Sequence, residues 1–122
     1  MAIASAITGI SSTFTISARF SAATGNVTIT NPGRAFRVLS VIGTGVAASV
    51  ITVKKNDNSG VVVSTVTTDV GNEPMFGKPT VANLDFLATD NVFILVADQN
   101  ATQVDILCVA TNGGETLVNA VA

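Results

Sequence analysis

The chain has 122 residues, of which only 11% are charged, and its formal net charge is −2. This length corresponds to one domain. Six Lys and Arg residues are too few for a strong phosphate-binding surface, so the composition argues against nucleic-acid binding. The mean hydropathy of +0.56 is high, yet no apolar run is long enough for a membrane-spanning helix. A composition this apolar predicts that a partner covers part of the surface.

The first twelve residues, MAIASAITGISS, are apolar and carry no charge. They lack the basic flank of a secretory signal, so we expect them to belong to the mature protein as an arm before a domain at 13–122. An extended arm can add main-chain hydrogen bonds to a sheet edge of a partner subunit, and Ile3, Ile7 and Ile10 would then contact it. The alternative is that the segment pairs within its own domain as a first strand that covers the outer face.

The rest of the chain is rich in Val, Ile and Thr and shows no 3.6-residue apolar period, which predicts an all-β domain without long helices. In residues 13–20 the apolar side chains alternate strictly with polar ones, so one face of that strand should be buried. The spacing of about eight short strands is typical of an antiparallel sandwich or barrel. The candidate strands in chain order are 13–20, 26–30, 35–43, 49–55, 61–69, a short one near 81–87, 92–97 and one ending at 110.

Two glycine-containing segments connect these strands. The stretch GTGVAA at 43–48 matches the letters of a dinucleotide-binding loop, but that loop requires a helix to follow, and SVITVKKND is strand-like. We therefore expect a plain strand connection and no cofactor. The stretch NDNSG at 56–60 predicts a hairpin turn, since Asn, Asp and Gly tolerate positive φ.

Residues 70–80 form the longest irregular piece, and we expect a contact loop here. Met75 and Phe76 lie between Pro74 and Pro79, where a turn normally carries polar residues. Prolines hold such a loop extended and reduce the ordering cost of binding. The alternative is that Phe76 folds back as a plug on the end of the sandwich.

The segment 90–110, DNVFILVADQNATQVDILCVA, predicts a hairpin of two strands. With the turn centred on Gln99 and Asn100, one face joins Phe93 and Leu95 to Ile106 and is compatible with a core. The opposite face would place apolar side chains where solvent is expected, and a bare patch of that size invites aggregation. We therefore expect another subunit or the N-terminal arm to cover this predicted interface face, which comprises Val92, Ile94, Val96, Leu107 and Val109.

No residue pattern indicates catalysis or a metal site. The chain contains no histidine, which removes the usual general base and transition-metal ligand. The single cysteine, Cys108, lies on the predicted core face of the hairpin, where a small buried hydrophobic role is expected. The sequence therefore predicts a protein that is not an enzyme.

A small, charge-poor β-domain with an apolar leader resembles the decoration (cement) and head-fibre proteins of tailed bacteriophages. Residues 36–68 followed by 83–110 are similar to the second half of viral jelly rolls, in which a turn such as ATDN at 88–91 introduces the penultimate strand. The resemblance implies a jelly-roll-like sandwich, frequent trimers and attachment to the capsid surface after synthesis in the host cytoplasm. The implied partners are the major capsid protein or other virion subunits. A tail or receptor-binding tip, and a small ligand-binding or adhesin module, are the alternatives.

Overall fold

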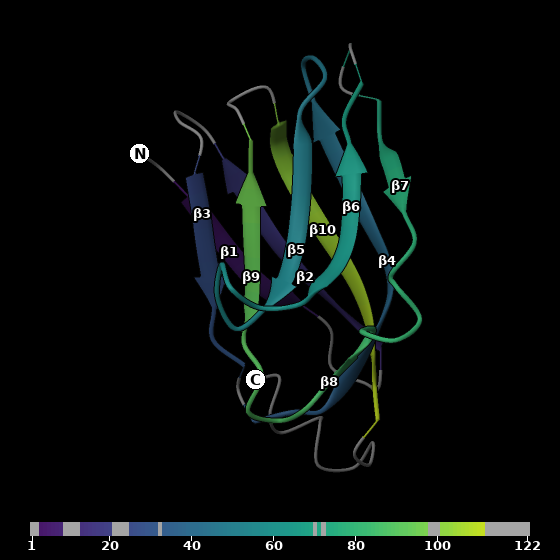
Figure 1. Cartoon of the computed structure of the whole chain (residues 1–122). Helices are drawn as coiled ribbons and strands as arrows, with labels where there is room; N and C mark the ends of the chain where they lie inside the picture. Colours follow the sequence, from purple (N-terminus) through teal and green to yellow (C-terminus); the bar gives the residue numbers. More distant parts are fainter. Residues whose placement is uncertain are drawn as a thin grey trace.

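The computed structural model describes residues 3–8, 13–20, 25–31, 33–69, 71, 73–97 and 101–111, with backbone only for 3–8 and 101–102. Among these residues there are ten strands and no α-helix, so the prediction of an all-β fold is confirmed (Figure 1). None of the described residues belongs to a helix that could cross a membrane. The strands are β1 (Ile3–Thr8), β2 (Thr13–Phe20), β3 (Gly25–Ile29), β4 (Phe36–Gly45), β5 (Val50–Lys55), β6 (Val62–Thr67), β7 (Met75–Gly77), β8 (Asp85–Phe86), β9 (Val92–Val96) and β10 (Ala101–Ala110).

The strands form two antiparallel sheets that pack face to face. Sheet A has the order β1-β2-β10-β4-β7, with β8 also paired to β4, and sheet B has the order β3-β9-β5-β6. If β1 and β8 are left out, eight strands remain, and they pair from the outside inward. The pairs are β2 with β10, β3 with β9, β4 with β7 and β5 with β6. This nested pairing is that of a long antiparallel hairpin wrapped across two sheets, which is the jelly roll.

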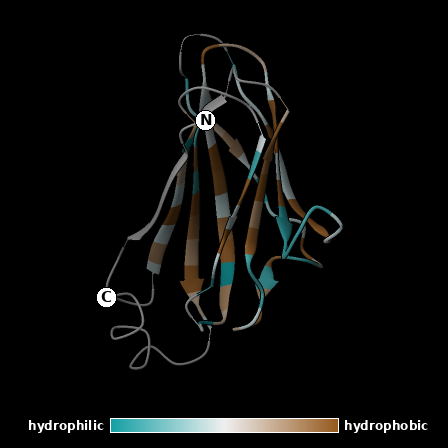
Figure 2. Cartoon of the chain, turned by 90° about the vertical axis from the view of Figure 1, so that its left-hand side faces the viewer, coloured by the Kyte–Doolittle hydropathy of each residue, from teal (hydrophilic) through white to brown (hydrophobic). Residues whose placement is uncertain are grey.

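The core lies between the sheets and is filled by alternate residues of their strands. In β2 the side chains of Phe14, Ile16, Ala18 and Phe20 are all buried, as the alternation predicted. Figure 2 shows hydrophobic residues concentrated along the strands. At one end of the core three aromatic rings meet, with Phe36 stacked on Phe86 at 4.7 Å between ring centres and edge-on to Phe14 at 5.4 Å. Such pairs stabilise a core beyond the area that they bury.

The predicted hairpin at 90–110 is wrong. The strand β9 pairs with β3 and β5 in sheet B, whereas β10 pairs with β2 and β4 in sheet A. The two strands therefore lie in different sheets and do not form a hairpin. The inward residues of β9 are those of the predicted interface face, because Val92, Ile94 and Val96 are 2%, 0% and 2% exposed. They belong to the domain's own core.

The N-terminal segment is also placed differently from the favoured expectation. Residues Ile3–Thr8 form β1 and pair antiparallel with β2 of the same chain, with Ile3 in register with Phe20 and Ile7 with Ile16. The segment thus follows the alternative of pairing within its own domain. It extends the edge of sheet A, however, and does not lie across the outer face. Ile10 lies outside the described residues.

Candidate interaction surface

The exposed large apolar side chains mark the surface where a partner can bury area. Three of them lie in β7 or in the segment between β7 and β9 and are each about two thirds exposed or more: Phe76 at 69%, Val81 at 86% and Leu87 at 67%. Burying a large apolar side chain stabilises an association by roughly 1.5–3 kcal/mol before the cost of binding is subtracted. The other exposed large apolar residues are Leu39, Val46, Val50, Val61 and Val62.

Phe76 is presented by a strand and not by the irregular loop that was expected. Met75–Gly77 form β7, and Phe76 is in register with Ile42 of β4 on the outer face of sheet A. Met75, on the inner face, is half-buried and packs against the core. The alternative in which Phe76 plugs the end of the sandwich is therefore wrong, because its side chain is the one that remains exposed.

The chain after β7 crosses from sheet A to the free edge of β6. The Thr80 N–H donates to Val63 O at 2.7 Å, and the Asn83 side-chain amide donates to Val62 O at 3.0 Å. The Ser64 hydroxyl donates to the Lys78 carbonyl at 3.1 Å. These bonds fix the segment that carries Val81 across the edge of the sandwich, so this apolar side chain is held by ordered backbone.

Leu87 lies at the opposite end of the loop region, and its backbone is fixed on both sides. Its N–H donates to the Asp90 carboxylate at 2.9 Å, while its carbonyl accepts from the Asp90 N–H at 2.9 Å and from the Asn31 side chain at 3.1 Å. When an exposed apolar side chain lies on an ordered backbone, binding costs little further backbone entropy. Sequence analysis missed Leu87, because the turn that orders it depends on Asn31, 56 residues away.

The side chains of Asn31, Asn56 and Asn91 form hydrogen bonds that connect the loop after β3, the turn after β5 and the loop before β9. Asn31 accepts from Arg34 N–H at 2.9 Å, and its amide donates to the carbonyls of Arg34 and Asp90 at 2.7 and 3.0 Å. Asn91 donates its N–H to Asn56 Oδ1 and accepts at Oδ1 from Asn31 N–H, both at 2.9 Å. Asn56 adopts a positive φ of 70°, as the predicted hairpin turn at 56–60 requires.

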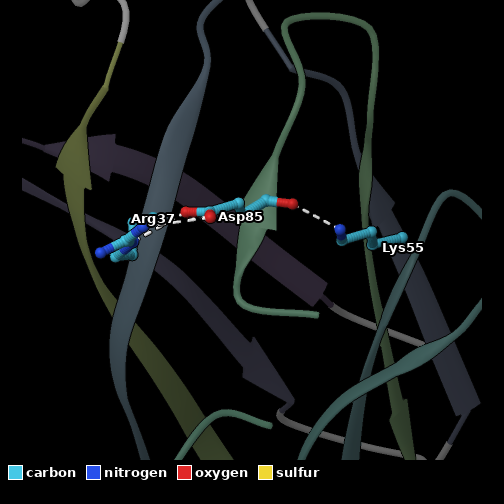
Figure 3. A network of polar contacts seen from close by, with 3 residues as sticks. All are labelled: Arg37, Lys55 and Asp85. Atoms are coloured by element: carbon cyan, nitrogen blue, oxygen red, sulfur yellow. Dashed lines mark hydrogen bonds and ion pairs between the residues drawn. The ribbon is translucent and has the colours of Figure 1, made fainter. Parts of the chain in front are cut away.

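Three charged residues, Arg37, Asp85 and Lys55, interact around the short strand β8. The Arg37 guanidinium forms a bidentate ion pair with Asp85, at 2.8 Å from Nε and 3.1 Å from Nη2 (Figure 3). On the other side of Asp85, the Lys55 ammonium donates to its main-chain carbonyl and lies 5.2 Å from the centre of the Phe86 ring. The hydrogen bond from Arg37 holds the pKa of Asp85 below its usual value. Both partners of the ion pair are about half exposed, so solvent screens their attraction and the pair contributes little to the stability of the fold.

A second polar group lies on the outer face of sheet A. The Asp105 carboxylate accepts from the Ser17 hydroxyl at 2.7 Å and from the Gln103 amide at 2.9 Å. The Arg19 guanidinium donates in turn to the Gln103 oxygen at 2.7 Å. Two residues of the predicted interface face, Leu107 and Val109, lie on this same outer side of β10 and are half-buried.

Cys108 and Arg34 are both buried among the core residues. Burial raises the pKa of the Cys108 thiol far above neutrality, although the nearby charge of Arg34 partly opposes this. Cys108 is fully buried, which confirms its expected role as a small core residue. Arg34 is 1% exposed, and its guanidinium lies 4.6 Å from the centre of the Phe14 ring. Within the part of the chain that the structure describes, no group of three or more potential ligands could hold a metal ion.

Comparisons with protein-family models, with curated proteins and with solved structures find no match to this chain. The functional proposal therefore rests on three exposed apolar side chains, Phe76, Val81 and Leu87, which lie on β7, beside the edge of β6 and in the turn before β9. Each is held by a backbone whose hydrogen bonds are formed within the domain. We call this set the anchor surface.

Proposed function

We propose that this protein is a non-enzymatic structural component of a virion, a decoration (cement) protein on the capsid surface. The observation that carries the proposal is Phe76, an aromatic side chain that is 69% exposed on a paired strand. Aromatic anchors of this kind dominate the energy of protein interfaces. The jelly-roll pairing of the strands supports the proposal, because it agrees with the phage structural proteins that the sequence resembles.

The mechanism follows from the arrangement of the anchor surface. Phe76, Val81 and Leu87 would enter apolar depressions formed where capsid subunits meet, and each copy would hold neighbouring subunits together. Since the backbone beneath each anchor is already ordered, binding would not have to order these segments, which lowers one of the costs of association. Many copies on one particle multiply a modest contact. The major capsid protein is the proposed partner.

The proposal is tested by co-sedimentation of the purified protein with empty capsids of the virus that encodes it. Wild-type protein is expected to sediment with the capsids, and Phe76→Ala is expected to lose most of this binding at an unchanged melting temperature. Val50→Ala is the matched control, since Val50 is an exposed apolar residue, 42% exposed, outside the anchor surface. It should bind like the wild type.

Two results would contradict the proposal. If wild-type protein stays in the supernatant and instead binds host cells or glycans, the receptor-binding tip or the adhesin module is the better description. If Phe76→Ala binds capsids as tightly as the wild type, Phe76 is not an anchor. Quantitative mass spectrometry of purified particles adds an independent measure, because a decoration protein is present in many copies and a tail tip in few.

A further inference from the structure

The hairpin turn between β5 and β6 places two charged groups beside the peptide bond that joins Asn58 to Ser59. The turn comprises residues 56–60, and its first four residues are exposed to solvent. The Asp57 carboxylate accepts a hydrogen bond from the Ser59 N–H at 2.8 Å. The Lys54 ammonium donates to the Asn58 main-chain carbonyl at 2.9 Å and lies 3.4 Å from the side-chain oxygen Oδ1 of the same residue.

The backbone of this turn is ordered by its own hydrogen bonds. Asp57 N–H donates to the Lys55 carbonyl at 2.8 Å, and Gly60 N–H donates to the Asp57 carbonyl at 2.9 Å. Lys55 N–H donates to the Val61 carbonyl at 3.2 Å. A Cβ atom at Gly60 would lie 1.7 Å from the Lys55 oxygen, so the chain closes tightly and requires glycine there. The charged groups around the turn are therefore held in place by its backbone.

The Asn58–Ser59 unit has the parts of an intramolecular reaction. The main-chain nitrogen after an asparagine can attack the side-chain amide, which closes a five-membered ring and releases ammonia. A branched following residue restricts this approach, whereas serine leaves it open. The attacking N–H must lose its proton, and the amide oxygen gains negative charge, so a base at the first and a cation at the second lower the barrier. Asp57 and Lys54 occupy these two positions.

We propose that Asn58 is a site of spontaneous deamidation, which the turn itself promotes. As the Ser59 nitrogen bonds to Asn58 Cγ, the Asp57 carboxylate takes the proton of the attacking N–H. The negative charge that forms on Oδ1 lies beside the Lys54 ammonium. The bond from Cγ to Nδ2 then breaks, and this nitrogen takes up a proton and leaves as ammonia. Water opens the resulting succinimide at either carbonyl, which gives aspartate or isoaspartate at position 58.

The reaction changes the charge of the turn. A neutral amide becomes a carboxylate beside Lys54, so the formal net charge of the chain changes from −2 to −3. None of the residues involved belongs to the anchor surface, so the proposal is independent of capsid attachment. The reaction needs water and no enzyme, and it can therefore be followed with the purified protein alone.

Incubation of the full-length protein at mildly alkaline pH, followed by peptide mapping with mass spectrometry, measures the rate at each asparagine. Asn58 is expected to deamidate faster in the native protein than in guanidinium chloride, where the turn is lost. Asn26 is the internal reference and should stay intact, because it is exposed but precedes the branched Val27 in β3. Mapping counts Asn112, which precedes Gly113, separately.

Two substitutions test the charged groups one at a time. Asp57→Ser removes the carboxylate but keeps a hydroxyl acceptor for the same N–H, and Lys54→Met removes the ammonium but keeps a long side chain. Each should slow the deamidation of Asn58 by about threefold or more. Lys55→Met is the matched control, since Lys55 carries the same charge but donates to a carbonyl of β8. It should leave the rate unchanged, and circular dichroism establishes that each variant is folded.

Two results would overturn the proposal. If Asn58 deamidates no faster in the native protein than in guanidinium chloride, the fold does not promote the reaction. If a folded Asp57→Ser or Lys54→Met variant keeps the wild-type rate, that charged group does not act on the Asn58–Ser59 unit in the way described.

Discussion

Gly77 of β7 lies against Val66 of β6 so closely that a Cβ atom at Gly77 would be 2.3 Å from Val66 Cγ2. The two residues belong to different sheets, and their contact closes one side of the sandwich. Because Gly77 has no side chain, β7 can approach β6 while pairing with β4, with Gly77 in register with Val41. This approach orders β7 and leaves Phe76 on the outer side.

Gly77→Ala is therefore expected to destabilise the fold by about 1–3 kcal/mol, the usual cost of overpacking a core. The added methyl group would also lie 3.2 Å from the main-chain oxygen of Thr65, which cannot move aside as easily as a side chain. Urea denaturation measures the change. The adjacent Lys78→Ala is the control, since Lys78 is exposed and a surface change of this kind should stay within about 0.5 kcal/mol. Equal stability of Gly77→Ala and the wild type would show that β7 does not pack in this way.

Ile94 and Phe76 should respond in opposite ways to a lysine substitution. Ile94 is fully buried, so Ile94→Lys places an unpaired charge in the core and should prevent folding, at a cost of several kcal/mol. Phe76→Lys places the same charge at an exposed position and should leave the circular dichroism spectrum and the melting temperature close to those of the wild type. A folded Ile94→Lys variant would mean that β9 turns its other face to the core.

Asn31→Ala should lower the melting temperature, because the Asn31 side chain makes five hydrogen bonds to the loops around it. Water can replace part of them at this half-buried position, so the expected loss is roughly 1–3 kcal/mol. Asn31→Asp keeps the acceptor for Gly33 and Arg34 but removes the donor to three carbonyls. It also places a charged carboxylate oxygen against those three carbonyl oxygens, and this repulsion should make it no more stable than the alanine variant. If the aspartate variant matches the wild type in thermal denaturation, the donor half of the network contributes nothing.

Acid should weaken the end of the fold where Asp85 and Asp90 lie. Burial raises the pKa of Asp90, but the hydrogen bonds from Leu87 N–H and the Asn56 amide, with the charge of Lys55, outweigh it, so the pKa is lowered overall. The pKa of Asp85 is lowered mainly by Arg37. A lowered folded pKa contributes stability that is fully present above the unfolded value, near 3.8, and is lost as the pH falls through the folded value.

The free energy of unfolding is thus expected to decrease as the pH falls below about 4, measured by urea denaturation at a series of pH values. A variant carrying Asp85→Asn and Asp90→Asn should be less stable near pH 6 and should show a flatter dependence on pH. If the double variant keeps the full acid dependence of the wild type, other carboxylates are responsible.

The Cys108 thiol should react with a thiol reagent only when the protein unfolds. It is fully buried, and its raised pKa keeps it protonated, whereas the thiolate is the reactive form. Labelling followed by mass spectrometry should show slow modification in native buffer and rapid modification in urea. Rapid labelling of the native protein would indicate that β10 opens locally.

The strands themselves were largely predictable from local pattern. In β2 the strict alternation of Phe14, Ile16, Ala18 and Phe20 with polar residues leaves one arrangement that buries the apolar side, whichever sheet the strand joins. The hairpin turn at Asn56 was equally local, because it depends on residues that tolerate positive φ. Such features need no knowledge of distant neighbours, and the structure confirms them.

Only the tertiary structure decided which strands are neighbours and which face of β9 is inward. After Val96 the chain can return within the same sheet, as a hairpin, or continue in the other sheet. The two cases turn opposite faces of β9 toward the core, because side chains alternate between the two faces of a strand. Local sequence is the same in both cases. The long-range pairing of β9 with β3 and β5 therefore placed Ile94 in the core, and the pairing of β7 with β4 turned Phe76 outward.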